Sequence, residues 1–378
     1  MTPNDTPDRP ILFSPMQIGK LRLPNRIVVA PMCQYSAVDG NAVDWHAIHL
    51  GSLAISGAGL LCIEATAVQR EGRITPGCLG LYGDENLTAM QRLVAALRSV
   101  SGIPLAIQLS HSGRKTSMRR PWDGGSHIPP EEGGWQPRGP SSIQRVPGEP
   151  VPDAFSLSDI RGIRDSFAAA AQRSCAAGVD AIELHMAHGY LLHQFLSPLS
   201  NQRLDEYGGS AKNRMRFPLE VFQAVREAAG PGVPVGVRLS GTDWADGGWD
   251  IEQAIEMAKE LEALGCAFLD ISSGGILHGQ KIANIGPGYQ VPLAARIKAA
   301  VDIPVIAVGL ITCPEHAEAI LEACDADLIA LARGFLNEPR WPWRAAAKLG
   351  ATVNAPPQLW RALPLGHAPI FARKDGIQ

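Results

Sequence analysis

Long hydrophobic runs are missing from this chain of 378 residues, and no segment approaches the roughly 20 apolar residues that a membrane-spanning helix needs. Residues 1–10 are polar and proline-rich, without the apolar segment of a secretion signal. Long basic runs are also missing, and the formal net charge is −3, which argues against nucleic acid or an anionic membrane as the main partner. We therefore expect a cytoplasmic protein that binds a small neutral or weakly charged molecule.

Paired cysteines are missing as well. The seven cysteines are an odd number, and no two of them form a Cys-x-x-Cys pair. They are scattered along the chain as Cys33, Cys62, Cys78, Cys175, Cys266, Cys313 and Cys324. This pattern indicates neither a disulfide framework nor an iron–sulfur or zinc cluster, so we expect reduced thiols and no metal site.

No Gly-x-Gly-x-x-Gly motif follows the first predicted strand, which weakens the case for a Rossmann fold. Two other strand signatures alternate instead. In one, a proline opens a short apolar run, because the first residue of a strand needs no ladder donor. In the other, the run follows a glycine or small turn that ends a helix. Together they predict strands within residues 23–30, 59–64, 103–109, 178–185, 233–239, 265–272, 303–309 and 325–333.

Alanine-rich helical patterns lie between these strands, at residues 87–100, 159–177, 219–229, 251–264, 291–300 and 314–323. Such alternation predicts parallel βα units, and eight strands of this kind favour a closed (β/α)8 TIM barrel over an open α/β sheet. The length would also fit two ordinary domains. The continuous alternation leads us to predict one domain over residues 1–378.

Side-chain alternation within the predicted strands supports closure into a barrel. Ile107 and Leu109 alternate with Gln108 along one predicted strand. Arg238 and Asp270 alternate with apolar neighbours in the same way on their own strands. The apolar side chains then face the helices, and the polar ones point into the barrel near its C-terminal mouth. A buried arginine there is costly unless a carboxylate or a ligand pairs with it.

Two connections between the predicted elements are long. Residues 111–156 are rich in Gly, Pro and Trp without periodicity, and residues 196–217 are polar. Both are predicted to be loops over the mouth of the barrel. The tail, about residues 341–378, reads as irregular, and we expect it at a subunit interface.

Two histidines and a tyrosine follow the fourth predicted strand, where residues 181–190 read AIELHMAHGY. A buried parallel strand often delivers polar side chains to a site at its C-terminal end, so His185, His188 and Tyr190 are candidates for one pocket. A lone histidine is more often an ordinary core or surface residue, but three such side chains at one strand end favour a site. The histidine spacing alone is no metal signature.

Motifs at successive strand ends carry a resemblance to a known family. They are PMCQY at 31–35, EATA at 64–67, Gln108, HMAHGY at 185–190, Arg238 and ALAR at 330–333. In this order they resemble the old yellow enzyme family, and the bacterial branch with cysteine after Pro-Met, which includes the xenobiotic reductases, is most similar. Each motif alone is weak, but together they extend over nearly the whole chain.

The resemblance implies non-covalent FMN and NADPH as the reductant. The pyrimidine edge of the flavin would meet Gln108 and the backbone around Ala30, Pro31, Met32 and Ala65. Arg238 would face the negative charge near N1 of the reduced flavin. The phosphate would lie on the backbone of Gly309, Ala332 and Arg333, where Ala332 departs from the usual Gly-Arg pair while keeping the N–H group.

The resemblance also implies an ene-reductase mechanism. His185 and His188 would donate hydrogen bonds to a carbonyl or nitro oxygen of an activated alkene, so that hydride adds at the β-carbon. Tyr190 would protonate the α-carbon, and Tyr35 would contact the substrate. Cys33 would lie against the flavin and shift its reduction potential.

The tail carries the last implied site residues. In the resembling branch a C-terminal arginine reaches the active site of a neighbouring subunit, and Trp360 and Arg361 stand in the equivalent place here. They would border the substrate cavity. A homodimer or homotetramer would follow.

Three other functions are compatible with parts of this pattern. A metal-dependent barrel hydrolase could use His185 and His188 with Glu64 or Asp270, but it leaves Gln108 without a role. A dienoyl-CoA reductase-like flavoenzyme would need a cysteine cluster and a second nucleotide-binding domain. A non-catalytic binding barrel is the simplest alternative.

Overall fold

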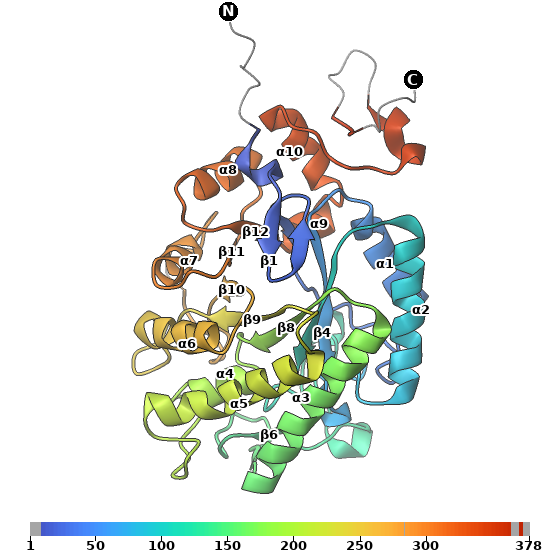
Figure 1. Cartoon of the computed structure of the whole chain (residues 1–378). Helices are drawn as coiled ribbons and strands as arrows, with labels where there is room; N and C mark the ends of the chain where they lie inside the picture. Colours follow the sequence, from blue (N-terminus) through green and yellow to red (C-terminus); the bar gives the residue numbers. More distant parts are fainter. Residues whose placement is uncertain (1–8, 283, 364–369, 373–378) are drawn as a thin grey trace, which may run out of the picture.

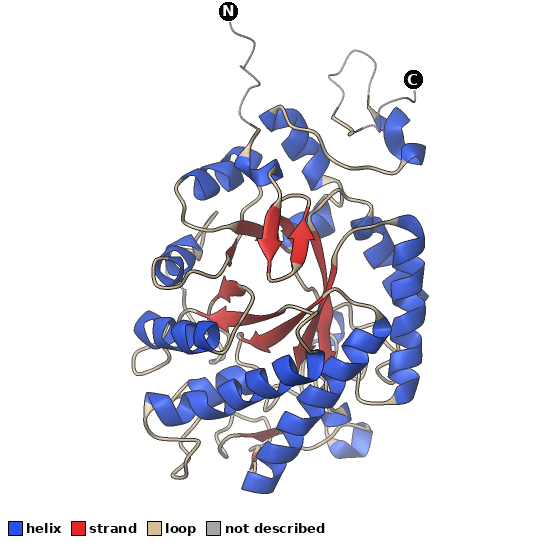
Figure 2. Cartoon of the chain, viewed as in Figure 1, coloured by secondary structure: helices blue, strands red, loops and turns tan. Residues whose placement is uncertain are grey.

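The computed structural model describes residues 9–282, 284–363 and 370–372. Eight parallel strands close into a barrel at its centre, with helices around it (Figures 1 and 2). In order around the barrel these are β3 (Ile27–Val29), β4 (Leu60–Ala67), β5 (Leu105–Ser110), β8 (Ala181–Met186), β9 (Val235–Ser240), β10 (Leu269–Ser272), β11 (Val305–Val308) and β12 (Leu328–Leu331). Each lies within or overlaps one predicted strand, so the predicted (β/α)8 barrel is confirmed.

Helices follow the strands on the outside of the barrel. They are α1 (Asp44–Ala54), α2 (Asp84–Val100), α3 (Leu157–Ala177), α4 (Leu191–Leu196), α5 (Ala211–Ala229), α6 (Ile251–Ala263), α7 (Val291–Lys298), α8 (Pro314–Glu322), α9 (Arg333–Asn337) and α10 (Trp341–Leu349). Local chemistry sets several ends: Ser156 accepts a hydrogen bond from the Asp159 N–H at the start of α3, and Gly178 ends it with φ 87°. The six helices predicted from alanine-rich patterns are all present.

Three regions differ from the prediction. Helix α1 was not predicted, because its apolar residues do not gather on one face of the sequence DWHAIHLGSLA. Residues 211–217 belong to helix α5 and not to a loop, since Ser210 caps this helix and Pro218 is tolerated inside it. Residues 341–349 form helix α10 and are not irregular, because Pro342 lies in its first turn, where no N–H is needed.

Two hydrophobic clusters hold the barrel together. The larger one lies between strands and helices and includes Ile107, Leu184 and Val237. The smaller one fills the barrel interior and includes Val28 and Ala106. This division confirms the predicted alternation of side chains, with the apolar phase facing the helices.

A short hairpin closes the N-terminal end of the barrel. It consists of β1 (Met16–Ile18) and β2 (Leu21–Leu23), and Ile18 and Leu23 join the interior cluster. Gly19 turns between the two strands with φ 54°, and a Cβ on it would lie 3.0 Å from Pro234, just before β9. The closed end leaves the C-terminal mouth as the place for a site.

The long β5–α3 connection folds back over this mouth. It contains η3 (Pro121–Asp123), η4 (Pro130–Glu132) and the short strands β6 (Arg138–Gly139) and β7 (Asp153–Ala154). Arg203, in the β8–α5 connection, donates hydrogen bonds to the carbonyls of Pro140 (2.9 Å) and Phe155 (2.6 Å). The two predicted long loops therefore pack on each other. The remaining short helices are η1 (Ile11–Phe13), η2 (Arg70–Gly72) and η5 (Pro357–Ala362).

Across the described ranges, no helix combines the length and the apolar composition that crossing a membrane would require.

Candidate active site

A tight turn after β8 presents the central side chains. His188 and Gly189 both have left-handed backbone, with φ of 58° and 70°. The His188 N–H donates to Ser240 Oγ (3.2 Å), and the Gly189 N–H donates to Nδ1 of buried His193 (2.9 Å). His193 Nε2 lies 2.9 Å from Asp243 Oδ1 on the next connection. The turn is thus held in an unusual conformation by buried polar groups, as is typical of functional sites.

The structure brings His185, His188 and Tyr190 into contact at the mouth. Nε2 of His185 and Nδ1 of His188 are 3.3 Å apart, and the two rings are nearly perpendicular at 86°. The Tyr190 ring centroid lies 4.9 Å from that of His185. A single ligand atom can therefore reach both imidazoles.

Both imidazoles are neutral. Burial, and next the positive charge of Arg238, lowers the pKa of His185 and of His188 well below the ordinary value. The Ala187 N–H donates to His185 Nδ1 (3.3 Å), so this nitrogen carries no proton. Neutral His185 therefore carries its proton on Nε2, which faces the mouth.

A row of buried polar side chains lies deeper in the barrel, one from each of four neighbouring strands. Gln108 Nε2 donates to Glu183 Oε1 (2.7 Å), and Arg238 Nε lies 3.1 Å from Asp270 Oδ2. All four are at most 6% exposed. Burial, together with the nearby charge of Asp270, raises the pKa of Glu183 to about 8. The buried arginine is thus paired with a carboxylate, while Asp270 Oδ1 has no hydrogen-bond partner.

Glu183 was not predicted as a site residue, and Asp270 was considered only as a metal ligand of the hydrolase alternative. Their sequence signal was available, because each is an acidic residue in the inward phase of an otherwise apolar strand. Their roles follow from contacts between neighbouring strands. Glu183 accepts a hydrogen bond from Gln108, and Asp270 pairs with Arg238.

Cys33 and Tyr35 lie on the other side of the mouth, after β3. Burial raises the pKa of the Cys33 thiol well above its ordinary value, and the nearby carboxylate of Glu64 adds to the effect. Burial also raises the pKa of the Tyr190 phenol, with Cys33 and Tyr35 as the next contributors, which places both near Tyr190. Cys33 is therefore a thiol and not a thiolate.

The regular strand ladder ends after β3 and is irregular within β4. Ala30 directly follows β3 and is buried, while Pro31 and Met32 are partly exposed. Ala65 lies where the β4–β5 register shifts, between Ile63 and Thr66. Such an irregularity leaves backbone groups outside the ladder and is frequent next to active sites.

The predicted phosphate residues lie together at the ends of adjacent strands β11 and β12. Gly309 has φ 134°, a conformation that disfavours any side chain, and Ala332 directly precedes α9. The Arg333 side chain is exposed. Its backbone N–H belongs to the first turn of the helix, where N–H groups lack intrahelical acceptors.

The structure places Trp360 and Arg361 away from their own mouth. Trp360 Nε1 donates to the Ala355 carbonyl (3.0 Å), and Arg361 is exposed. Ala355 and the adjacent Pro356 line a cavity with the C-terminal ends of α1 and α2, which lie at the N-terminal face of the barrel. These two residues are therefore not part of the site that their own chain forms. Residues 364–369 and 373–378 of the predicted interface tail lie outside the described residues.

Lys115 is a site residue that the sequence did not reveal. Its Nζ donates to the carbonyls of His188 (2.7 Å) and Gly275 (3.2 Å) and lies 4.7 Å from the Tyr190 ring centroid. Burial, and next the positive charge of Arg145, lowers the pKa of Lys115 to about 8. The sequence feature that could have indicated Lys115 is the charged pair Arg114-Lys115, near the start of a loop rich in Gly and Pro.

The candidate carboxylate ligands of the hydrolase hypothesis are engaged elsewhere. Glu64 Oε2 accepts a hydrogen bond from the Gln34 N–H (3.0 Å), and burial raises its pKa to about 8. Asp270 pairs with Arg238. Among residues 9–282, 284–363 and 370–372, no three His, Cys, Asp or Glu side chains are placed to hold a metal ion together. All seven cysteines are free thiols.

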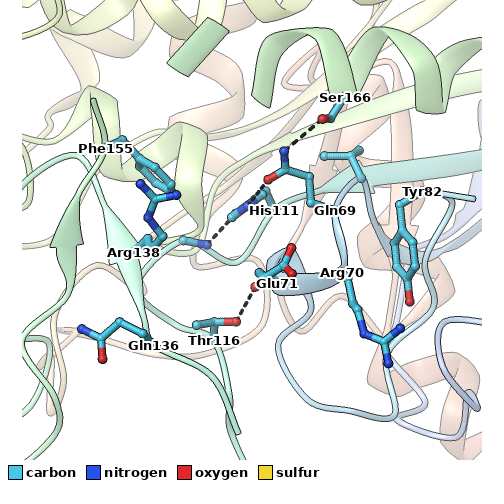
Figure 3. A pocket seen from close by; sticks show the side chains of 12 residues that line it. Gln69, Arg70, Glu71, Tyr82, His111, Thr116, Gln136, Arg138, Phe155 and Ser166 are labelled. Atoms are coloured by element: carbon cyan, nitrogen blue, oxygen red, sulfur yellow. Dashed lines mark hydrogen bonds between the residues drawn. The ribbon is translucent and has the colours of Figure 1, made fainter. Parts of the chain in front are cut away.

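A separate pocket of about 400 Å³ lies outside the mouth, between η2, the β5–α3 connection and α3 (Figure 3). Its polar groups bind one another: His111 Nε2 lies 3.2 Å from Gln69 Oε1, and Gln69 Nε2 donates to Ser166 Oγ (3.0 Å). Burial, and next the charge of Arg138, lowers the pKa of His111 to about 3, so that this imidazole is neutral. None of the predicted site residues lines this pocket.

Comparison with known proteins defines the class. The family model described as NADH:flavin oxidoreductase / NADH oxidase matches residues 11–351. The chain belongs to this family, the flavin oxidoreductases of the old yellow enzyme type, which use FMN with NADPH as reductant.

Individual relatives agree with this assignment. The chain is 42% identical over 365 residues to an NADH:flavin oxidoreductase of Gibberella zeae, covering 92% of this chain and 88% of the relative. It is 40% identical over 353 residues to an NADPH dehydrogenase of Geobacillus thermodenitrificans, covering 93% and 98%. The structure of morphinone reductase superposes with a TM-score of 0.75 at 31% identity, covering 93% and 92%.

These findings confirm that the protein is an oxidoreductase, as predicted. The hydrolase and the non-catalytic barrel are therefore set aside. The ene-reductase and the dienoyl-CoA reductase-like hypotheses are both compatible with the family.

Proposed function

We propose that the protein is an ene-reductase, which uses NADPH and FMN to reduce the C=C bond of α,β-unsaturated carbonyl or nitro compounds. The observation that carries the proposal is the convergence of His185 Nε2 and His188 Nδ1, 3.3 Å apart, beside Tyr190. Two neutral imidazoles whose ring nitrogens converge on one point suit an oxygen on which negative charge develops, once both nitrogens carry a proton. A proton donor next to that point suits addition across a double bond.

The residues at the mouth fit FMN. Bound FMN supplies hydride transfer between NADPH and the substrate. Gln108 donates to Glu183, which leaves its carbonyl and a second N–H for a flat heteroaromatic edge. The buried Nε of Arg238 has no hydrogen-bond partner among the residues that the structure describes, although Asp270 balances its charge. A permanent cation there suits negative charge at the pyrimidine edge.

We assign the other flavin contacts to backbone groups. Ala30, Pro31, Met32 and Ala65 would meet the ring at the end of β3 and at the register shift of β4. The N–H groups around Gly309, Ala332 and Arg333 would bind the phosphate, which suits the loops after the last two strands of this fold.

Tyr190 would protonate the α-carbon of the substrate. Its phenol has a raised pKa through burial, so it holds a proton at neutral pH. The nearby ammonium of Lys115, 4.7 Å from the ring centroid, would stabilise the phenolate left after proton transfer. Burial raises the pKa of Tyr190 and so weakens its phenol as a proton donor, and Lys115 would offset this effect.

Tyr35 and Cys33 would complete the pocket from the first loop. Tyr35 has left-handed backbone, with φ 51°, and packs its ring edge-on against Trp122 of the long loop at 5.9 Å. This contact joins the two walls of the substrate cavity. Cys33, as a partly buried thiol, would tune the reduction potential of the flavin by contact and without a covalent bond.

Loading the protein with FMN tests the proposal. We expect about one non-covalent FMN per chain, bleaching by NADPH without oxygen, and rapid recovery of the flavin absorbance on addition of 2-cyclohexenone, with cyclohexanone as product. Stopped-flow absorbance and gas chromatography measure these steps. A flavoprotein that NADPH reduces but that neither enones nor nitroalkenes reoxidise would contradict ene reduction. Reoxidation by an enoyl-CoA thioester alone would favour the dienoyl-CoA reductase-like alternative.

We further propose that the chain forms a homodimer or homotetramer in which the tail, about residues 341–378, lies at a subunit interface. Val38, Trp45 and Ile48, on and before α1, are 66%, 49% and 68% exposed. Trp45 Nε1 donates to Gln34 Oε1 (3.1 Å), so this apolar surface adjoins the Cys33–Tyr35 wall of the mouth. A neighbouring subunit on this surface would bring its Trp360 and Arg361 near the substrate.

Mixed oligomers test the contribution of the tail. One chain carries Trp360→Ala and Arg361→Ala, and the other carries His185→Ala and His188→Ala. If the tail crosses between subunits, mixed dimers contain one intact site, and about half of the parent activity per dimer returns on mixing. Native mass spectrometry verifies the exchange. Verified mixed dimers without recovered activity would show that the tail does not complete the neighbouring site.

A further inference from the structure

Ser272, at the end of β10, contacts His188 on the side away from His185. Its Oγ lies 2.6 Å from His188 Nε2, the ring nitrogen that faces away from His185. Ser272 is 4% exposed. It also donates to Gln290 Oε1 (3.3 Å), an oxygen to which Ser273 donates at 2.5 Å.

The hydrogen bonds among His185, His188, Ser272 and Gln290 allow two arrangements of the protons. Without a ligand, the His185 Nε2 proton points to His188 Nδ1, so the His188 proton must be on Nε2, where it points to Ser272 Oγ. Ser272 then donates to Gln290. In this arrangement His188 has no N–H to offer a substrate.

A substrate oxygen between the imidazoles needs the second arrangement. His188 must then carry its proton on Nδ1, beside the Nε2 proton of His185. Because neutral imidazole has a single N–H, Nε2 becomes an acceptor and needs a buried donor. Ser272 is placed for this task, since a rotation of its hydroxyl turns the proton from Gln290 to His188.

We propose that Ser272 is a positioning residue that selects the Nδ1–H tautomer of His188 and so completes the pair of donors for the substrate oxygen. The inference rests on the proposed function and adds to it the group that controls the second donor. One proton leaves Nε2 and one binds Nδ1 by exchange with water, so the imidazole stays neutral. Gln290 Oε1 keeps the hydrogen bond from Ser273, so the rotation leaves no buried oxygen unpaired.

The FMN-loaded enzyme with 4-nitrophenol, whose anion mimics a substrate oxyanion, tests this inference. Selective 15N labelling of histidine reports the tautomer of His188 by NMR, independently of turnover. We expect a change from Nε2–H to Nδ1–H when the phenolate binds. An Nε2–H tautomer in the complex of the parent enzyme would overturn the inference without any variant.

Substitutions provide the second arm. We expect Ser272→Ala to weaken phenolate binding by about 10- to 100-fold, the usual effect of losing a partner that fixes a functional histidine, while the FMN dissociation constant is unchanged. Ser272→Thr keeps the hydroxyl and should restore binding. Ser174→Ala is the matched control, because this buried serine donates to the Ala170 carbonyl within α3 and has no part in the His188 network.

The possible results separate this inference from the proposed function. Equal phenolate binding in Ser272→Ala and the parent, an equal loss in Ser174→Ala, or loss of FMN from Ser272→Ala would each overturn the role of Ser272. A parent enzyme that binds FMN but reduces no activated alkene would instead contradict the proposed function, whatever the tautomer.

Discussion

Replacing both His185 and His188 with alanine should lower the rate of enone reduction by at least about 100-fold, because even one lost donor to a developing oxyanion costs about that much. Both donors converge on one point in the structure, so neither can replace the other fully. FMN content and reduction by NADPH should remain near the parent values, since the flavin contacts are assigned to other residues. Stopped-flow measurement of the two half-reactions separates these effects.

A matched control exists on the outer helices. His316 on α8 belongs to a helix outside the barrel, and its alanine variant loses an imidazole ring there. It should keep the parent rate of reoxidation. If the His185 and His188 variant also keeps that rate, the two histidines are structural and the oxygen is bound elsewhere.

Changing Tyr190 to phenylalanine should slow reoxidation of the reduced enzyme by an enone about 100- to 10,000-fold, the usual range for loss of a positioned proton donor. The ring remains against His185, so the pocket keeps its shape. Reduction by NADPH needs no proton from this phenol and should be unaffected. Separate rapid-mixing experiments for each half-reaction measure the difference.

Tyr207 provides the control for this variant. Its hydroxyl donates to Glu220 (3.1 Å), away from the mouth, and Tyr207→Phe removes the same group without touching the site. Equal slowing of both half-reactions in the Tyr190 variant would contradict a role in protonation. It would indicate a change in flavin binding or packing.

Much of the fold could be predicted because its signals are local. A proline at a strand start, a glycine at a helix end and alternating side chains each depend on a few neighbouring residues. The same periodicity showed which strand residues point inward, and so placed Gln108 and Arg238 in the interior. Helix α1 escaped prediction because its residues show no apolar face, and packing over the strands defines it.

Several contacts of the proposed active site could not be predicted from short sequence segments. Lys115 and His188 are 73 residues apart in sequence, and their contact exists because the long loop folds over the mouth. Ser272 is one of many serines until the barrel sets it 2.6 Å from His188. Glu183 and Asp270 find their partners by strand register, which the sequence of one strand does not contain.

The sequence by itself determined the barrel and the residue types at its strand ends, because strand periodicity and end signals are properties of short segments. The tertiary structure decided which of those side chains meet, which imidazole nitrogen carries the proton, and that Trp360 and Arg361 lie apart from the mouth of their own chain. The physical reason is that hydrogen-bond direction and burial depend on groups from several strands and loops at once.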